Sequence, residues 1–284
     1  MQLDIFRHSR DVALRNALID AMKRRATAAV DSAAAALAAE YPADALLPDA
    51  AELCRWLRTS LPQADAAAAL ADMEGRIEPA ARRVLGNGAR AWLAPCWQEL
   101  ARTMAGQAFD PDAEALHAAP LFLRAGDWRA AVTAVESIPA WRRRPAPLGW
   151  MIEARRHLDG AAAVWPMLAE LAWMAPQRAR RLLPRLADDR LASLLRRFDS
   201  EFAGSDGPDG FSLFPAWLLV EDGSFAAPLK SAEQGRGTGP ERCARLVVTL
   251  LGLERQGRHD ELIESRRRLR DLDGALFEWY MRSR

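Results

Sequence analysis

The stretch LFLRAGDWRAAVTAVESIP, residues 121–139, decides the fold of this 284-residue chain. It holds two runs of helix-forming residues with a break between them at Gly126 and Asp127. Glycine readily takes the left-handed conformation that ends a helix, and an aspartate carboxylate can cap the first turn of the next one. We therefore predict two antiparallel helices that meet at Gly126–Asp127, with Trp128 buried in the groove between them.

The rest of the chain is typical of the same kind of structure. Half of the residues are hydrophobic, Ala, Leu and Arg are abundant, and β-branched residues are sparse, which favours helices over strands. Apolar residues recur at helical spacing, for example at Leu14, Leu18 and Met22. Gly257 marks a second break between two helical runs. The sequence thus predicts an all-α fold built from antiparallel helical hairpins.

The break also carries a resemblance to a known family. GDWRAAV, residues 126–132, resembles the turn between the two helices of the tetratricopeptide repeat (TPR), which has Gly, an acid, an aromatic, two variable residues, Ala and an aliphatic residue. Looser copies lie at 157–176 and 256–272, at irregular spacing. Pro166 and Pro184 are expected to interrupt helices, which departs from the family pattern. The resemblance implies hairpins stacked as a short right-handed TPR-like α-solenoid.

Composition changes along the chain suggest three parts. Residues 1–203 are expected to form the body of helical hairpins. Residues 204–240 are rich in Gly, Pro and Ser and read as loops around one short docked helix, FPAWLLVE, at 214–221. Residues 241–284 are expected to form a C-terminal helical hairpin that packs on the body.

No common catalytic or metal-binding pattern stands in the sequence. HExxH, a Walker loop, GxGxxG after a strand and GxSxG are all missing. The stretch SDGPDG at 205–210 lacks oxygen ligands that a calcium loop needs, and Asp188–Asp189 suits helix capping by Asp189 better than magnesium binding. We predict no catalytic residue, no metal and no cofactor, and we expect that the protein is not an enzyme.

The cysteines and histidines fit this prediction. Cys54, Cys96 and Cys243 are far apart in the sequence and lie in apolar helical contexts, as buried free thiols do. The four histidines, His8, His117, His157 and His259, are isolated, so we expect them on the surface or in grooves rather than on a metal.

The N-terminus and the lengths of the apolar runs suggest where the protein resides, and its basic residues suggest the type of genome that encodes it. The first ten residues include charges and no apolar signal segment, and no apolar run is long enough for a membrane span. We expect a reduced, cytoplasmic protein that does not bind membranes. Arg supplies 37 of the 39 basic residues, which together with the abundant Ala indicates a bacterial-type, GC-rich genome.

Charge is uneven in the middle of the chain. Basic and acidic residues nearly cancel overall, at 39 against 38, but residues 142–197 hold twelve arginines and five acids. Arginines near helix ends also interact favourably with the helix dipole, so a purely structural role is the alternative to partner binding. As a hypothesis, a partner binds to the arginines Arg142, Arg143, Arg144, Arg155, Arg156, Arg178, Arg180, Arg181 and Arg185.

These observations favour a non-enzymatic protein–protein interaction adaptor or scaffold subunit. Its partner would be another protein with an acidic or mixed-charge segment, bound on a concave or arginine-rich face. One alternative is a helical-repeat protein that binds nucleic acid through the arginines and tryptophans of the middle region. Another is an all-α enzyme of unrecognised type. The sequence predicts neither the oligomeric state nor the partner's identity.

Overall fold

The computed structural model describes residues 3–59, 66–202, 207, 209–233, 235 and 237–284, with side chains from residue 10 onward. Helices make up almost all of this structure, and no strand occurs in these ranges. The predicted all-α fold is therefore confirmed. The chain divides into two compact units, Met1–Asp127 and Trp128–Arg284.

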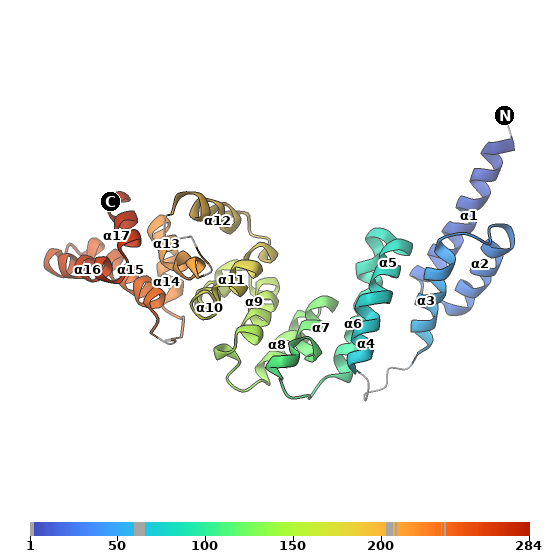
Figure 1. Ribbon diagram of the computed structural model, residues 1–284, viewed down its shortest axis with the longest axis horizontal. Helices are drawn as coiled ribbons and strands as arrows, with labels where there is room; N and C mark the ends of the chain where they lie inside the picture. The colour runs from blue at the N-terminus through green and yellow to red at the C-terminus, as the bar shows by residue number, and fades with distance from the viewer. Residues whose placement is uncertain (1–2, 60–65, 203–206, 208, 234, 236) are drawn as a thin grey trace. The chain divides into compact units, whose positions relative to one another are not determined.

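The first unit contains seven α-helices among its described residues (Figure 1). They are α1 (Leu3–Lys23), α2 (Thr27–Glu40), α3 (Leu46–Arg58), α4 (Ala66–Asp72), α5 (Glu78–Leu85), α6 (Ala89–Thr103) and α7 (Ala118–Ala125). The short elements are η2 (Met73–Ile77), η3 (Gly86–Gly88) and η4 (Pro111–Leu116), of which η2 is a π-helical turn.

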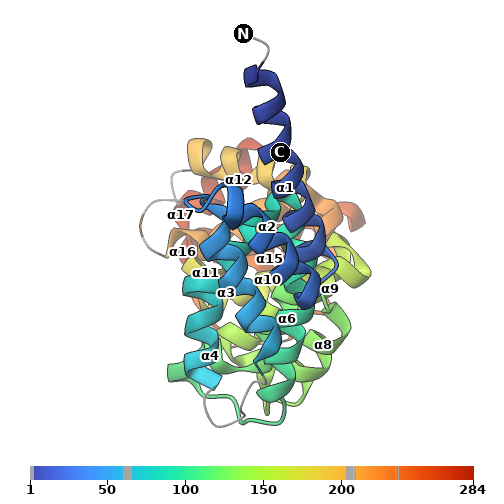
Figure 2. The same cartoon turned by 90° about the vertical axis from the view of Figure 1, so that its right-hand side faces the viewer.

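Helices of the first unit pack on their neighbours in the chain. The helix α2 packs on both α1 and α3, and these three lie side by side in Figure 2 as well as in Figure 1. The next contacts run from α3 to α5, from α5 to α6 and from α6 to α7. The indole N–H of buried Trp92 in α6 donates to the carbonyl of Met22 in α1 at 2.8 Å. This bond ties the later helices to the first one.

The second unit holds the remaining helices. They are α8 (Trp128–Glu136), α9 (Pro145–Asp159), α10 (Ala161–Met174), α11 (Pro176–Leu182), α12 (Asp189–Glu201), α13 (Phe214–Glu221), α14 (Ala226–Leu229), α15 (Gly239–Gln256), α16 (His259–Leu272) and α17 (Gly274–Arg282). The short 3₁₀ elements among the described residues of this unit are η5 (Trp141–Arg143), η6 (Leu183–Leu186), η8 (Gly210–Leu213) and η9 (Gly223–Phe225).

The helix α13 forms the centre of the second unit. It is the short apolar helix predicted at 214–221, and Trp217 in it is fully buried against the ring of Phe198. One hydrophobic core extends from Leu148 to Tyr280 and includes α13, α15 and α17. The predicted boundaries after residues 203 and 240 both lie inside this unit. The described part of 222–232 contains η9 and α14, so it is not the continuous loop that its composition suggested.

Both predicted turn glycines adopt the left-handed conformation. Gly126 has φ of 76° at the end of α7, and Gly257 has φ of 68° at the end of α15. After Gly257, α16 packs back along α15, which confirms that hairpin. After Gly126, α7 has its partner α6 in the first unit and α8 has its partner α9 in the second. The pairing of α7 with α8 joins the two units and stays a prediction, as does the stacked solenoid.

Asp127 and Trp128 follow Gly126 at the break. Asp127 accepts a hydrogen bond from Nε2 of Gln98 at 3.3 Å, and its predicted capping of α8 stays a prediction. Trp128 is half-buried instead of fully buried, and its indole lies flat on the ring of His157 in α9. The ring centroids are 3.8 Å apart and the planes differ by 7°.

Three further sequence-based expectations were wrong in detail. The helical run before Gly126, which the sequence favours as one helix over 112–126, is divided at His117, which is buried and caps α7 by accepting the Ala119 N–H on Nδ1 at 3.2 Å. The helix α10 continues through Pro166, so this proline does not end it as expected. Asp188, not Asp189, caps α12 by accepting from the Leu191 N–H at 3.0 Å.

Candidate binding pocket

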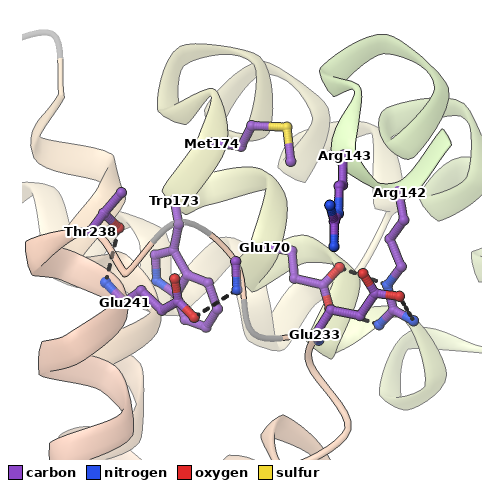
Figure 3. Close-up of a pocket in the computed structure, with 9 residues that line it drawn as sticks. Arg142, Arg143, Glu170, Trp173, Met174, Glu233, Thr238 and Glu241 are labelled. Atoms are coloured by element: carbon purple, nitrogen blue, oxygen red, sulfur yellow. Dashed lines mark hydrogen bonds and ion pairs between the residues drawn. The ribbon is translucent and has the colours of Figure 1, made fainter. Parts of the chain in front are cut away.

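The second unit contains a cavity of about 380 Å³ beside the arginine-rich segment. Its walls come from η5, from the end of α10, and from the segment that leads into α15 (Figure 3). It is lined by Arg142, Arg143, Glu170, Trp173, Met174, Glu233, Gly235, Thr238 and Glu241. The fold thus brings two of the predicted arginines together with residues about 30 to 100 positions later.

Arg142 and Glu170 form the first of two buried anchors in this pocket. Nε and Nη2 of Arg142 donate to the two carboxylate oxygens of Glu170 at 2.8 and 2.7 Å. The same Nη2 donates to the carbonyl of Ser231 at 3.3 Å, and the backbone N–H of Glu233 donates to Glu170 Oε1 at 2.7 Å. The hydrogen bond to Glu170 raises the pKa of Arg142 above its usual value. The ion pair therefore fixes the start of the segment 231–238.

Glu241 forms the second anchor, at the start of α15. Its buried carboxylate accepts the backbone N–H groups of Gly235 and Gly237, both at 3.0 Å, and Nε of Arg245 at 3.0 Å. Burial by itself would raise the pKa of Glu241, but these hydrogen bonds hold that pKa below its usual value. A Cβ at Gly235 would lie 3.1 Å from Glu241 Oε2, so this close approach favours glycine. Thr238 caps α15 by accepting the Glu241 N–H at 3.4 Å.

Two charged groups in the pocket remain available to a ligand. Arg143 is exposed, and its guanidinium has no hydrogen bond or ion pair with any described residue. The Glu233 side chain is 49% exposed, and its ion pair with Nη1 of Arg142 is long, at 3.6 Å. Trp173 and Met174 add apolar surface between the anchors. The pocket therefore offers one free cation and one weakly engaged carboxylate beside an apolar patch.

The arrangement suits binding better than proton transfer. Glu241 stays ionised at neutral pH because its pKa is lowered, so it cannot act as a general acid there. Glu170 already has hydrogen-bond donors on both oxygens. No group of three or more His, Cys, Asp or Glu with metal-binding geometry occurs in the part of the chain that the structure describes.

Most of the predicted partner-binding arginines interact within the protein. Arg155 pairs with Asp159 at 3.1 Å and Glu136 at 3.4 Å, and Arg180 pairs with Asp199 at 2.8 Å. Two of these carboxylates, Glu136 and Asp199, lie outside residues 142–197, and they offset part of the positive charge counted within that segment. Arg185 forms an ion pair with Glu153, and Arg156 donates a hydrogen bond to the Ala187 carbonyl. Arg144 and Arg178 also interact with other residues of the protein.

Only two of the nine predicted arginines are exposed and unpaired among the described residues. These are Arg143, in the pocket, and Arg181, in α11 outside it. The structure therefore does not present the arginines of residues 142–197 as one continuous free basic face. Binding of a partner to the predicted set stays a prediction.

Sequence reasoning missed the acidic and aromatic half of the pocket. A signal was present for Glu241, because Thr238-Gly-Pro-Glu241 matches the capping-box pattern at a helix start. Glu170 and Trp173 read as ordinary residues of an apolar helix, and no local pattern connects them with Arg142 or Glu233.

The remaining chemistry-bearing residues are accounted for by packing. Cys54, Cys96 and Cys243 are buried free thiols, as predicted, and burial raises the pKa of Cys243 to about 12. The side chain of His8 and half of the stretch 205–210 lie outside what the structure describes. None of the described helices combines the length and apolarity that a membrane crossing requires.

Comparisons with protein-family models, curated proteins and solved structures gave no match to this chain.

Proposed function

We propose that the protein is a non-enzymatic interaction adaptor, and that a partner protein binds in the pocket through Arg143. The observation that carries this proposal is the division of charges in the pocket. The buried Glu170 and Glu241 are used to hold the fold, while Arg143 and Glu233 point their charges to a site that a ligand can reach. The TPR-like turns at Gly126 and Gly257 support the same class of function, because stacked hairpins of that type commonly bind other proteins.

The free groups favour a partner with a mixed-charge segment. A carboxylate of the partner can accept two parallel hydrogen bonds from the guanidinium of Arg143. A basic side chain can pair with Glu233, and an apolar side chain can cover Trp173 and Met174. The volume of about 380 Å³ fits a few side chains of a peptide rather than a folded domain.

Charge reversal at Arg143, compared with charge reversal at Arg181, tests this proposal. Both arginines are exposed and lack a partner among described residues, but only Arg143 lines the pocket. Tagged parent, Arg143→Glu and Arg181→Glu proteins are used to capture partners from cells that express the chain, with nuclease added. We expect Arg143→Glu to reduce the captured partner about tenfold or more, as for loss of a charge-assisted hydrogen bond, and Arg181→Glu to leave it unchanged.

Three outcomes would contradict the proposal in different ways. Equal losses in both variants would assign binding to a diffuse basic surface. Unchanged capture by Arg143→Glu would remove the pocket from the account. Loss of the captured material on nuclease treatment would favour the nucleic-acid alternative.

A further inference from the structure

A second concave surface lies between the two helices of the α15–α16 hairpin. It is a shallow groove of about 520 Å³. Its lining residues are Arg242, Arg245, Leu246, Thr249, Arg268, Asp271 and Leu272. The α15 members follow the i, i+3, i+4, i+7 pattern and the α16 members the i, i+3, i+4 pattern, so each helix contributes one continuous stripe.

The floor of this groove is apolar, and its walls carry three arginines and one aspartate. Leu246 and Leu272 are half-buried and pack against the core of the unit from below. Arg242 on the α15 wall is exposed and has no partner among the described residues. Arg268 on the α16 wall pairs with Glu264, but both side chains are more than half exposed, so the pair is weak.

The other charges of the groove differ in how firmly they are held. Arg245 is held by the buried Glu241. Asp271 lies 3.7 Å from Nε of its neighbour Arg270, but both side chains are more than half exposed, so this pair is as weak as that of Arg268 with Glu264. The charges left to a ligand are therefore two cations, Arg242 and Arg268, on opposite walls of an apolar floor, and one carboxylate, Asp271, on the α16 wall.

We propose that this groove binds an acidic amphipathic helix of a partner protein. Leucine-like side chains of that helix would pack on Leu246 and Leu272, and flanking carboxylates would pair with Arg242 and Arg268. A helix suits the groove better than an extended segment, because a helix satisfies its own backbone hydrogen bonds and the walls offer side chains rather than a strand edge. The stripe from residue 242 to residue 249 is about 10 Å long, which corresponds to about two helical turns.

This inference goes beyond the proposed pocket function and rests on different residues. Neither Arg143 nor Glu233 lines the groove. Charge reversal at Arg143 is therefore expected to leave binding at the groove unchanged, so the two proposals can fail separately.

The test uses the full chain and a fluorescent synthetic helix with leucines along one face and glutamates on both flanks. A second probe replaces every glutamate with lysine. Fluorescence anisotropy is measured for the parent, Arg242→Glu, Arg268→Glu, the double variant and the matched control Arg267→Glu. Arg267 is the neighbour of Arg268 on the same helix, is exposed, has no partner among described residues and does not line the groove.

The expected results follow from the positions of the charges. The parent should bind the glutamate helix and not the lysine helix. Each charge reversal in the groove should weaken binding about fivefold, the upper range for an exposed ion pair. The double variant should prefer the lysine helix, and Arg267→Glu should match the parent. With a photoreactive phenylalanine in place of Thr249, the glutamate helix should crosslink at that position.

Other results would overturn the proposal. The proposal fails if the parent does not bind the glutamate helix. It also fails if the glutamate helix binds but does not crosslink to position 249. Equal weakening by Arg267→Glu would indicate non-specific attraction between charges. Equal binding of the lysine helix, or of a DNA oligonucleotide with the same number of negative charges, would show that the groove does not select an acidic helix. Circular dichroism of each variant checks that these surface changes leave the fold intact.

Discussion

Arg142 and Glu170 are 28 positions apart in the sequence and form a two-pronged ion pair in which the carboxylate is almost fully buried. The pair joins η5 to α10, and through Glu170 Oε1 it also holds the backbone N–H of Glu233. An arginine that the sequence suggested for partner binding is therefore part of the ion pair that holds the wall of the pocket.

Removing Arg142 is expected to lower the free energy of unfolding. Arg142→Ala would leave the Glu170 carboxylate buried with only the Glu233 N–H as a donor. Loss of one partner of a buried ion pair typically destabilises a protein by about 3–5 kcal/mol, and partial exposure of Arg142 places this case near the lower end. The measurement is the free energy of unfolding in urea. Arg180→Ala, which removes a more exposed ion pair with Asp199, is the control and should cost less than about 1 kcal/mol. Equal losses in the two variants would contradict the structural role of Arg142.

Glu241 is expected to control the segment before α15. Glu241→Gln keeps the size of the side chain but removes the negative charge of the carboxylate that accepts hydrogen bonds from Gly235, Gly237 and Arg245. We expect faster amide hydrogen exchange at Gly235 and Gly237 and a loss of about 1–3 kcal/mol. Glu264→Gln, at an exposed ion pair, is the control and should change neither measurement. Unchanged exchange in Glu241→Gln would show that other contacts hold the segment.

The lowered pKa of Glu241 also gives a pH dependence with a defined sign. Its folded-state pKa lies below the unfolded value of about 4.3. Its contribution to stability is therefore fully present above that unfolded value and is lost as the pH falls through the folded-state pKa. The stability of Glu241→Gln should accordingly fall less steeply than that of the parent at acidic pH.

We expect a second pH dependence of stability, closer to neutrality, from the protonation of His117. Burial lowers the pKa of His117 below its usual value, and protonated Nδ1 could no longer accept the Ala119 N–H. The unfolded chain therefore binds more protons, so this contribution is present above pH about 6.5 and is lost as the pH falls through that value towards the folded-state pKa. His117→Asn keeps a capping acceptor without the titration and should remove this part of the pH dependence. Urea unfolding at several pH values tests this, with exposed His259→Asn as the control. A parent-like pH profile in His117→Asn would contradict it.

The features that the sequence predicted well are local. Gly126 and Gly257 were recognised because a helix end needs a residue that tolerates positive φ, and this requirement acts within a few residues. The apolar run at 214–221 was recognised because a helix that is apolar on all sides must be buried.

The pocket depends on contacts between distant residues, which local patterns do not encode. Arg142 could be counted as a basic residue, but its partner Glu170 lies in a helix that reads as apolar. Counting charges within 142–197 also left out carboxylates such as Glu136 and Asp199, which reach that segment from outside. The half-burial of Trp128 was missed for the same reason, since its partner His157 lies 29 positions later.

The stack of Trp128 on His157 is expected to stabilise the fold. A fully buried tryptophan truncated to alanine typically costs about 3–5 kcal/mol. Trp128 is half-buried, so we expect Trp128→Ala to lose about 1–3 kcal/mol of unfolding free energy. Part of this loss should come from the ring contact itself, because the centroids lie 3.8 Å apart with nearly parallel planes. A double-mutant cycle of Trp128→Ala and His157→Ala measures that part, which is expected to be about 0.5–1.5 kcal/mol. Strictly additive losses would show that Trp128 stabilises α8 through contacts other than His157. A variant that unfolds like the parent would assign the indole to binding instead of packing.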